Sequence, residues 1–271
     1  MDLPSLALLG VVVAVLLARA VLRERRDYAK FKRMRTTAAR QKVFRRWLVE
    51  AFLVLGGLGL ATVVGAWESI PRALTAAQAW EPVAAVRDFL GTPEGVITAI
   101  VVAVLGLAAL VLPPILARGS SLDDIPAVGD IRAIIPRSLG ELRYGAALSV
   151  NAGVTEEVLF RLGMPALVFA VTGDAVVAFI AATVLFGVLH VYQGAPGIVF
   201  STIAGVVLTA LYVVSGSILL PIAVHALLDL RSMVLLPVAL GTVGPRPAPT
   251  AAAPPTPAPA APAEPDPAPE G

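Results

Sequence analysis

Long apolar stretches separated by short polar segments dominate this chain. Seven of these stretches are predicted to be membrane-spanning helices, because a helix needs about 20 mainly apolar residues to cross a bilayer. They cover residues 3–22, 47–67, 95–117, 141–172, 174–192, 196–215 and 217–240. In the first stretch the basic residues follow the apolar run, which favours a retained helix over a signal peptide. The pattern predicts an all-α, polytopic membrane protein with about seven transmembrane helices.

The composition agrees with this prediction. Of the 271 residues, 57% are hydrophobic and 15% are charged, whereas a soluble domain carries about 25% charged residues. The chain contains no cysteine. Disulfide partners and thiolate metal sites are therefore excluded.

The basic residues gather between the first two predicted spans. Residues 23–46 hold eleven Lys and Arg, and such a loop stays in the cytoplasm. This predicts an external N-terminus and a cytoplasmic C-terminal tail in the plasma (inner) membrane. We expect the basic loop to contact anionic lipid headgroups. No aromatic or motif pattern in it indicates nucleic acid, so no nucleic-acid partner is expected.

The C-terminal segment differs from the rest of the chain. Eleven of the 23 prolines lie between Gly244 and Gly271. Such a segment cannot bury a core, so a disordered, Pro/Ala-rich tail is predicted over residues 241–271. No internal repeat is evident, which weighs against a transporter built from duplicated halves.

Charged residues inside the fourth span are the first candidates for function. A charge at the centre of a membrane helix costs roughly 2.5–3.5 kcal/mol, yet this span holds Glu156, Glu157 and Arg161, together with Asn151. Glu157 and Arg161 are four residues apart on one helical face, so an ion pair is predicted. Glu156 points about 100° away from Glu157. We expect it to face another helix or water.

The two histidines lie in other predicted spans. His190 follows Phe186 by four residues, and His225 precedes Asp229 by four residues. A single intramembrane histidine is more often a hydrogen-bonding partner between helices than a catalyst. Two histidines with several acids on three helices are best explained by one shared polar cavity. Proton relays and ion sites are the competing uses of such a set.

These residues form a series that resembles a known family. Glu-Glu-x-x-x-Arg at 156–161, Phe-x-x-x-His at 186–190 and His-x-x-x-Asp at 225–229 are similar to the motifs of the CPBP intramembrane proteases. That family includes type II CAAX prenyl endopeptidases and bacteriocin-processing or self-immunity proteins. The resemblance covers about residues 135–235. It implies an intramembrane endopeptidase core over residues 135–240, with a membrane-associated protein or peptide as substrate. The predicted N-terminal transmembrane helices over residues 1–134 lie outside the resemblance.

The resemblance also implies roles for individual residues. Glu156 would be the general base that activates water, and His190 would position that water. His225 and Asp229 would stabilise the oxyanion, while Glu157 and Arg161, with Phe186 of the second motif, would support the site. Many family members carry Asn in place of Asp229. A protonated Asp229, a carboxylate that orients His225 and a carboxylate that helps to bind a cation are the three alternatives.

Other mechanisms are compatible with parts of the sequence. Glu156, His190 and His225 form an acceptable zinc ligand set, but there is no H-E-x-x-H motif. A metal-free, glutamate-dependent mechanism and a metal-dependent one both stay open, so no cofactor is certain. A serine mechanism through Ser217 is excluded, because eight helical residues place it about 12 Å from His225. Spacing does not exclude Ser201, but it lacks any surrounding motif. The alternative functions are a non-proteolytic, immunity-like membrane protein and a proton- or cation-coupled carrier.

Overall fold

The computed structural model describes residues 3–121, 129 and 131–243, and this part of the chain contains helices and no strands. The first half comprises α1 (Leu3–Ala18), η1 (Arg19–Glu24), α2 (Arg25–Phe31), α3 (Thr37–Gly65), α4 (Ser69–Gln78), α5 (Glu81–Leu90) and α6 (Pro93–Leu116). The second half comprises η3 (Arg132–Ile134), α7 (Leu139–Glu157), η4 (Val158–Gly163), α8 (Met164–Thr172), α9 (Ala175–Leu189), η5 (His190–Gln193), α10 (Gly194–Ser215), α11 (Leu219–Leu230), η6 (Arg231–Leu235) and α12 (Leu236–Ala239). The predicted all-α fold is confirmed.

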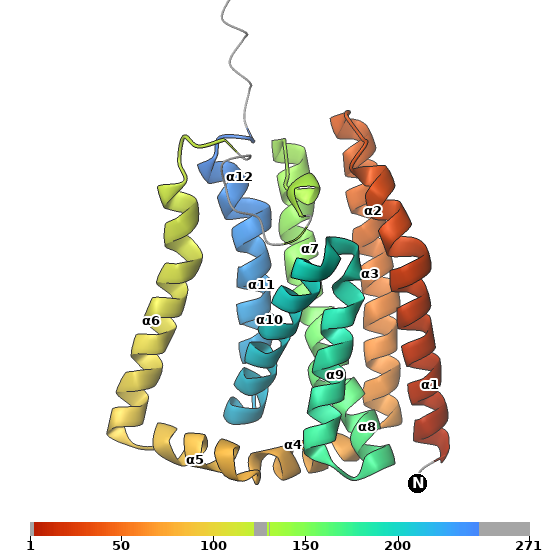
Figure 1. Cartoon of the computed structure of the whole chain (residues 1–271), viewed down its shortest axis with the longest axis vertical. Coiled ribbons are helices and arrows are strands. Elements are labelled where there is room, and N and C mark those ends of the chain that lie inside the picture. The colour runs from red at the N-terminus through yellow and green to blue at the C-terminus, as the bar shows by residue number, and fades with distance from the viewer. Residues whose placement is uncertain (1–2, 122–128, 130, 244–271) are drawn as a thin grey trace, which may run out of the picture.

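Five helical stretches of the described chain are long and apolar enough to cross a membrane: Leu3–Phe31, Thr37–Gly65, Pro93–Leu116, Ala175–Ser215 and Leu219–Ala239. The fourth of these contains both α9 and α10, which pack against each other (Figure 1). The continuous helix from α7 to α8 is not among these five stretches, and the number of seven spans stays a prediction. The protein is a polytopic helical membrane protein.

The basic segment is more ordered than the predicted loop. α2 continues the first helix to Phe31, and α3 begins at Thr37, so only residues 32–36 connect them. Thr36 caps α3 by accepting a hydrogen bond from the backbone N–H of Ala39. The prediction of a loop between residues 22 and 47 was therefore wrong. The helices extend past their apolar parts because the segment buries Tyr28, Phe31 and Phe44 in a common cluster.

Two short helices cross one end of the bundle. α4 and α5 occupy most of residues 68–94, between the second and third predicted spans, and they connect α3 to α6 (Figure 1). α6 stands at the side of the bundle. It contacts α5 near its beginning and η6 and α12 near its end, and most of its large apolar residues are exposed on the protein surface.

α7 packs closely against α3 on one side and α11 on another. Small residues allow this approach: a Cβ on Gly153 would lie 3.0 Å from Ala226 and from the carbonyl oxygen of Ile222 in α11. A Cβ on Gly59 of α3 would lie 3.3 Å from Val158. Close helix packing through glycine is common in membrane proteins, where apolar residues gain little from contacting each other instead of lipid. The acidic pair Glu156–Glu157 is thereby held inside the bundle.

One expectation falls on residues outside the described part. The predicted disordered tail lies almost wholly beyond residue 243. The proposed division into an N-terminal helical part, a core and a tail stays a prediction.

Candidate active site

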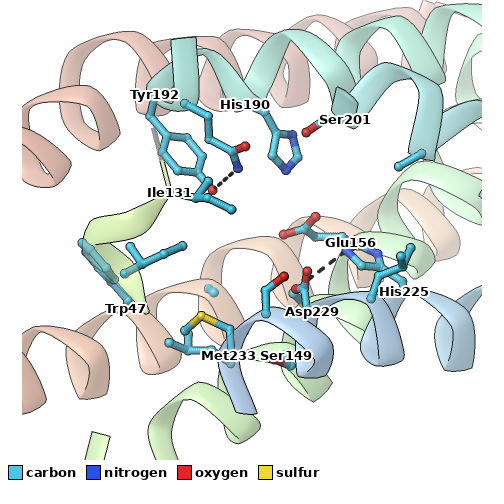
Figure 2. A pocket seen from close by; sticks show the side chains of 18 of the residues that line it. Trp47, Ile131, Ser149, Glu156, His190, Tyr192, Ser201, His225, Asp229 and Met233 are labelled. Atoms are coloured by element: carbon cyan, nitrogen blue, oxygen red, sulfur yellow. Dashed lines mark hydrogen bonds and ion pairs between the residues drawn. The ribbon is translucent and has the colours of Figure 1, made fainter. Parts of the chain in front are cut away.

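A cavity of about 610 Å³ opens inside the helix bundle. Its walls come from the first helical stretch, α3, the end of α6, α7, the η5–α10 region and α11 with η6. Glu156, His190, His225 and Asp229 all line it, and Figure 2 shows them grouped at one end. The structure thus brings the four predicted catalytic residues from three separate helices into one cavity.

Glu157 lies at the last position of α7 and is fully buried. Its Oε1 accepts a hydrogen bond from Arg161 Nη1 at 3.0 Å, which is the predicted pair on one helical face. The same Oε1 lies 2.6 Å from His225 Nδ1. Because a carboxylate oxygen accepts, the imidazole donates its Nδ1 proton to Glu157. Glu157 therefore connects the first motif to the third.

Arg161 is held by further contacts that the sequence did not indicate. Its Nη2 donates to the carbonyl oxygen of Gly205 in α10 at 3.3 Å. Its guanidinium lies over the ring of Phe186, 4.6 Å from the centroid, a distance at which a cation–π attraction operates. Gly205 leaves room for this arrangement, since a Cβ there would lie 3.1 Å from Phe186 and 3.6 Å from Arg161 Nη2.

Phe186 is the aromatic centre of the site. Its ring contacts His190 with a centroid distance of 4.8 Å and His225 with 6.0 Å. Its carbonyl oxygen accepts the Nδ1 proton of His190 at 2.8 Å. This fixes the tautomer of neutral His190 and leaves Nε2 as the other functional atom. His190 stands where α9 ends and η5 begins.

Glu156 differs from its neighbour in having no assigned partner. It lines the cavity and makes no hydrogen bond or ion pair with another described residue, whereas Glu157 makes both. Asn151, on the same helix, also lines the cavity, and its Nδ2 is buried without a hydrogen-bond partner in the described structure. These two residues offer a carboxylate and an amide to whatever enters the cavity.

The comparisons with known proteins bear on this arrangement. The family described as "Type II CAAX prenyl endopeptidase Rce1-like" matches residues 138–231. The predicted family resemblance is confirmed. This Rce1-like segment is about a third of the chain and contains all three motifs. No curated protein and no solved structure matches the chain.

Within the Rce1-like segment, the position of Asp229 bears on one of its three alternatives, the carboxylate that orients His225. Its Oδ2 lies 4.0 Å from His225 Nε2, which is too long for a hydrogen bond. Glu157, and not Asp229, is the hydrogen-bonding partner that orients the His225 ring. The carboxyl group of Asp229 is 42% exposed and faces the cavity (Figure 2).

The candidate zinc ligands do not form a metal site in this structure. Among the described residues, no three His, Asp or Glu side chains lie in positions that could hold a metal ion. The tautomers of the two histidines do not exclude a metal, because their Nδ1 protons go to Phe186 and Glu157 and both Nε2 atoms stay free, as in metal-bound histidines. It is the placement of Glu156, His190 and His225 relative to one another that does not fit zinc in this geometry.

A belt of ion pairs lines the cavity outside the Rce1-like segment. Arg19 binds Glu24 at 2.7 Å, and Arg23 binds Glu50 of α3 at 2.5 Å. These four residues and Asp27 all line the cavity. Sequence reasoning missed the belt because the motifs lie elsewhere, although charges at the edges of the first two spans were a signal. The N-terminal helices thus complete a cavity whose motifs lie in the second half of the chain.

Proposed function

We propose that this protein is an intramembrane endopeptidase that hydrolyses a peptide bond of a membrane-associated substrate with a water molecule activated by Glu156. The observation that supports the proposal is that two adjacent glutamates have different surroundings. Glu157 is buried and bound to Arg161 and His225, while Glu156 faces the cavity without a partner. We assign a structural role to the paired Glu157 and a reactive role to Glu156.

The proposed reaction needs a base, an acid and a site for the oxyanion. Glu156 takes a proton from water as the water oxygen attacks the carbonyl carbon of the scissile bond. The tetrahedral intermediate then collapses, the C–N bond breaks, and Glu156 returns the proton to the leaving amine. General acid–base action of this kind contributes typically about 10²–10⁴-fold to the rate. His190 would hold the water through Nε2, because its Nδ1 is committed to Phe186.

The oxyanion would be stabilised by His225. Its Nδ1 donates to Glu157 at 2.6 Å, so Nε2 can donate to the oxyanion when the ring carries both protons as an imidazolium. An oriented donor in a water-poor site stabilises developing negative charge more strongly than it would in water. Asp229 would contribute as a second donor in its protonated form, which is the role that an asparagine amide plays without protonation. Phe186 and Arg161 would hold the two histidines and Glu157 in place.

The substrate would be a protein or peptide that reaches the cavity from the membrane. The proposed location is the plasma (inner) membrane, with the N-terminus outside and the tail in the cytoplasm, which rests on the basic residues in 23–46. This orientation places the cavity end formed by α2, η3 and the start of α7 on the cytoplasmic side.

The second candidate function is a non-proteolytic binding protein of the same fold, and the third is a proton- or cation-coupled carrier. The unpartnered Glu156 weighs against both, since a buried-span carboxylate kept only for structure would be paired. A carrier would show ion-dependent transport, whereas the proposed enzyme would not.

Glu156→Gln tests the proposal, with Glu157→Asp as the matched variant of the neighbouring residue. Membrane proteomes of cells with the wild type and with Glu156→Gln are compared, and fragments seen only with the wild type identify a substrate peptide. With purified proteins, Glu156→Gln should lower the cleavage rate of that peptide by roughly 10²-fold or more while melting like the wild type. Near-normal turnover by Glu156→Gln would contradict the assigned base.

A further inference from the structure

A short segment crosses the end of the cavity that lies away from Glu156. Residues 131–137 lead into α7 and include η3. Ile131, Arg132, Ile134 and Ile135 of this segment line the cavity. Figure 2 shows Ile131 at the end of the pocket opposite His225. We call residues 131–137 the strap.

The strap is tied to the bundle by one buried arginine. Arg40 of α3 is 1% exposed. Its Nη1 donates to the carbonyl oxygen of Ala133 at 2.9 Å, and its Nη2 donates to that of Ile135 at 3.1 Å. Its Nε and Nη2 also bind the two oxygens of Glu141, at 3.0 and 3.1 Å. The guanidinium therefore binds a carboxylate as a fork and holds two strap carbonyls at the same time.

Glu141 ties the strap from the other side. This residue lies in the first turn of α7 and is fully buried. Its Oε2 accepts a hydrogen bond from the backbone N–H of Arg137 at 2.9 Å. The ring of Phe31 lies 4.5 Å from the Arg40 guanidinium, which fills the remaining side of this site. A buried ion pair is weak evidence for stability by itself, so the contacts to strap carbonyls are the informative feature.

Gly129, which precedes the strap in the sequence, lies close to η5. Its φ is +76°, and a Cβ on it would lie 3.0 Å from the carbonyl oxygen of Gln193. Gln193 ends η5, the element that begins with His190. Gly129 therefore lies beside η5, on the His190 side of the cavity, while the strap leads to the start of α7, where Arg40 and Glu141 bind it.

We propose that the strap defines the entry to the cavity at this end, and that Arg40 and Glu141 are positioning residues that set its width. Three hydrogen bonds between these two residues and the strap fix its backbone, and this keeps Ile131 and Ile134 at the cavity wall. The strap places three isoleucines and Arg132 at the cavity wall, and its fixed backbone would admit a narrow, extended chain and exclude bulky groups. This inference uses the cavity of the proposed function, but it holds for any molecule that enters that cavity.

The absence of cysteine from the chain allows a direct test without a substrate. Ala152 lines the cavity one helical turn before Glu156. A single cysteine introduced as Ala152→Cys would report which reagents reach the reactive carboxylate. The protein is placed in lipid nanodiscs and treated with methyl methanethiosulfonate, which is small, or with a bulky, water-soluble biotinylated methanethiosulfonate. The measured quantity is the ratio of the bulky to the small modification rate.

Arg40→Ala should raise this ratio by roughly tenfold or more, because removing one partner of a buried pair strands the other charge and releases the strap. Arg40→Lys should give an intermediate ratio, since an ammonium cannot bind the carboxylate as a fork. Arg45→Ala is the matched control, because Arg45 lies on the same helix and is exposed. The control should leave the ratio unchanged.

Ile131→Ala keeps the test decisive if Arg40→Ala does not fold. It shortens a side chain at the entry without touching the ion pair, and it should also raise the ratio. An unchanged ratio in Ile131→Ala and in every folded Arg40 variant would overturn the proposal. Failure of the proposed peptidase activity would be seen separately, because the modification rates require no proteolysis.

Discussion

Removal of the Arg161 guanidinium should destabilise the protein more than any change at Glu156. Arg161 is 1% exposed and binds Glu157 at 3.0 Å, Gly205 at 3.3 Å and the ring of Phe186 at 4.6 Å. Arg161→Ala leaves the fully buried Glu157 with His225 as its remaining hydrogen-bonding partner among the described residues. Breaking a buried pair in this way costs about 3–5 kcal/mol. At a few degrees per kcal/mol, the expected loss in melting temperature is roughly 10 °C.

The assay is thermal unfolding of the purified protein in one detergent, followed by intrinsic fluorescence. Arg161→Lys should lie between the wild type and Arg161→Ala, because lysine keeps the charge but loses the second hydrogen bond. Arg46→Ala is the control: its ion pair with Asp27 involves an arginine that is 46% exposed, and such pairs contribute about 0–1 kcal/mol. If Arg161→Ala melted within the range of Arg46→Ala, the reasoning from burial and pairing would be refuted.

Three further predictions concern the reaction and the packing of the site. Asp229→Asn should retain activity and extend it to higher pH, because an amide keeps an N–H donor that does not ionise, while Asp229→Ala should lower the cleavage rate roughly 10²–10³-fold. The test is the pH–rate profile of the wild type and both variants on one peptide, and an Asn variant as inactive as the Ala variant would exclude the donor role. Gly205→Ala should cost about 1–3 kcal/mol and lower the cleavage rate, since its Cβ would press on Phe186 at 3.1 Å; melting and turnover comparable to the wild type would contradict the close approach. A chelator should leave the cleavage rate unchanged, because the described residues offer no group of three ligands; inactivation reversed by added zinc would oppose the metal-free mechanism.

The membrane-spanning character and the composition of the site could be predicted from local pattern. Apolar runs of about 20 residues specify spanning helices because the bilayer interior provides no hydrogen-bonding partners for an open backbone. The pairing of Glu157 with Arg161 followed from helical geometry, and the structure confirms it at 3.0 Å. The rarity of ionisable residues within spans was enough to identify Glu156, His190 and His225 as candidates.

The sequence by itself therefore determined the class of fold, the approximate helices and the residues of interest. Only the tertiary structure decided how these residues are connected. The bond from His225 to Glu157 joins positions 68 residues apart, and the carbonyl of Gly205 that binds Arg161 belongs to a different helix. No periodicity along the chain contains such information, because it depends on which helices lie side by side. The strap held by Arg40 is a further case: its hydrogen bonds span more than 90 residues, and the basic composition of residues 23–46 gave no sign that one of their arginines would be buried.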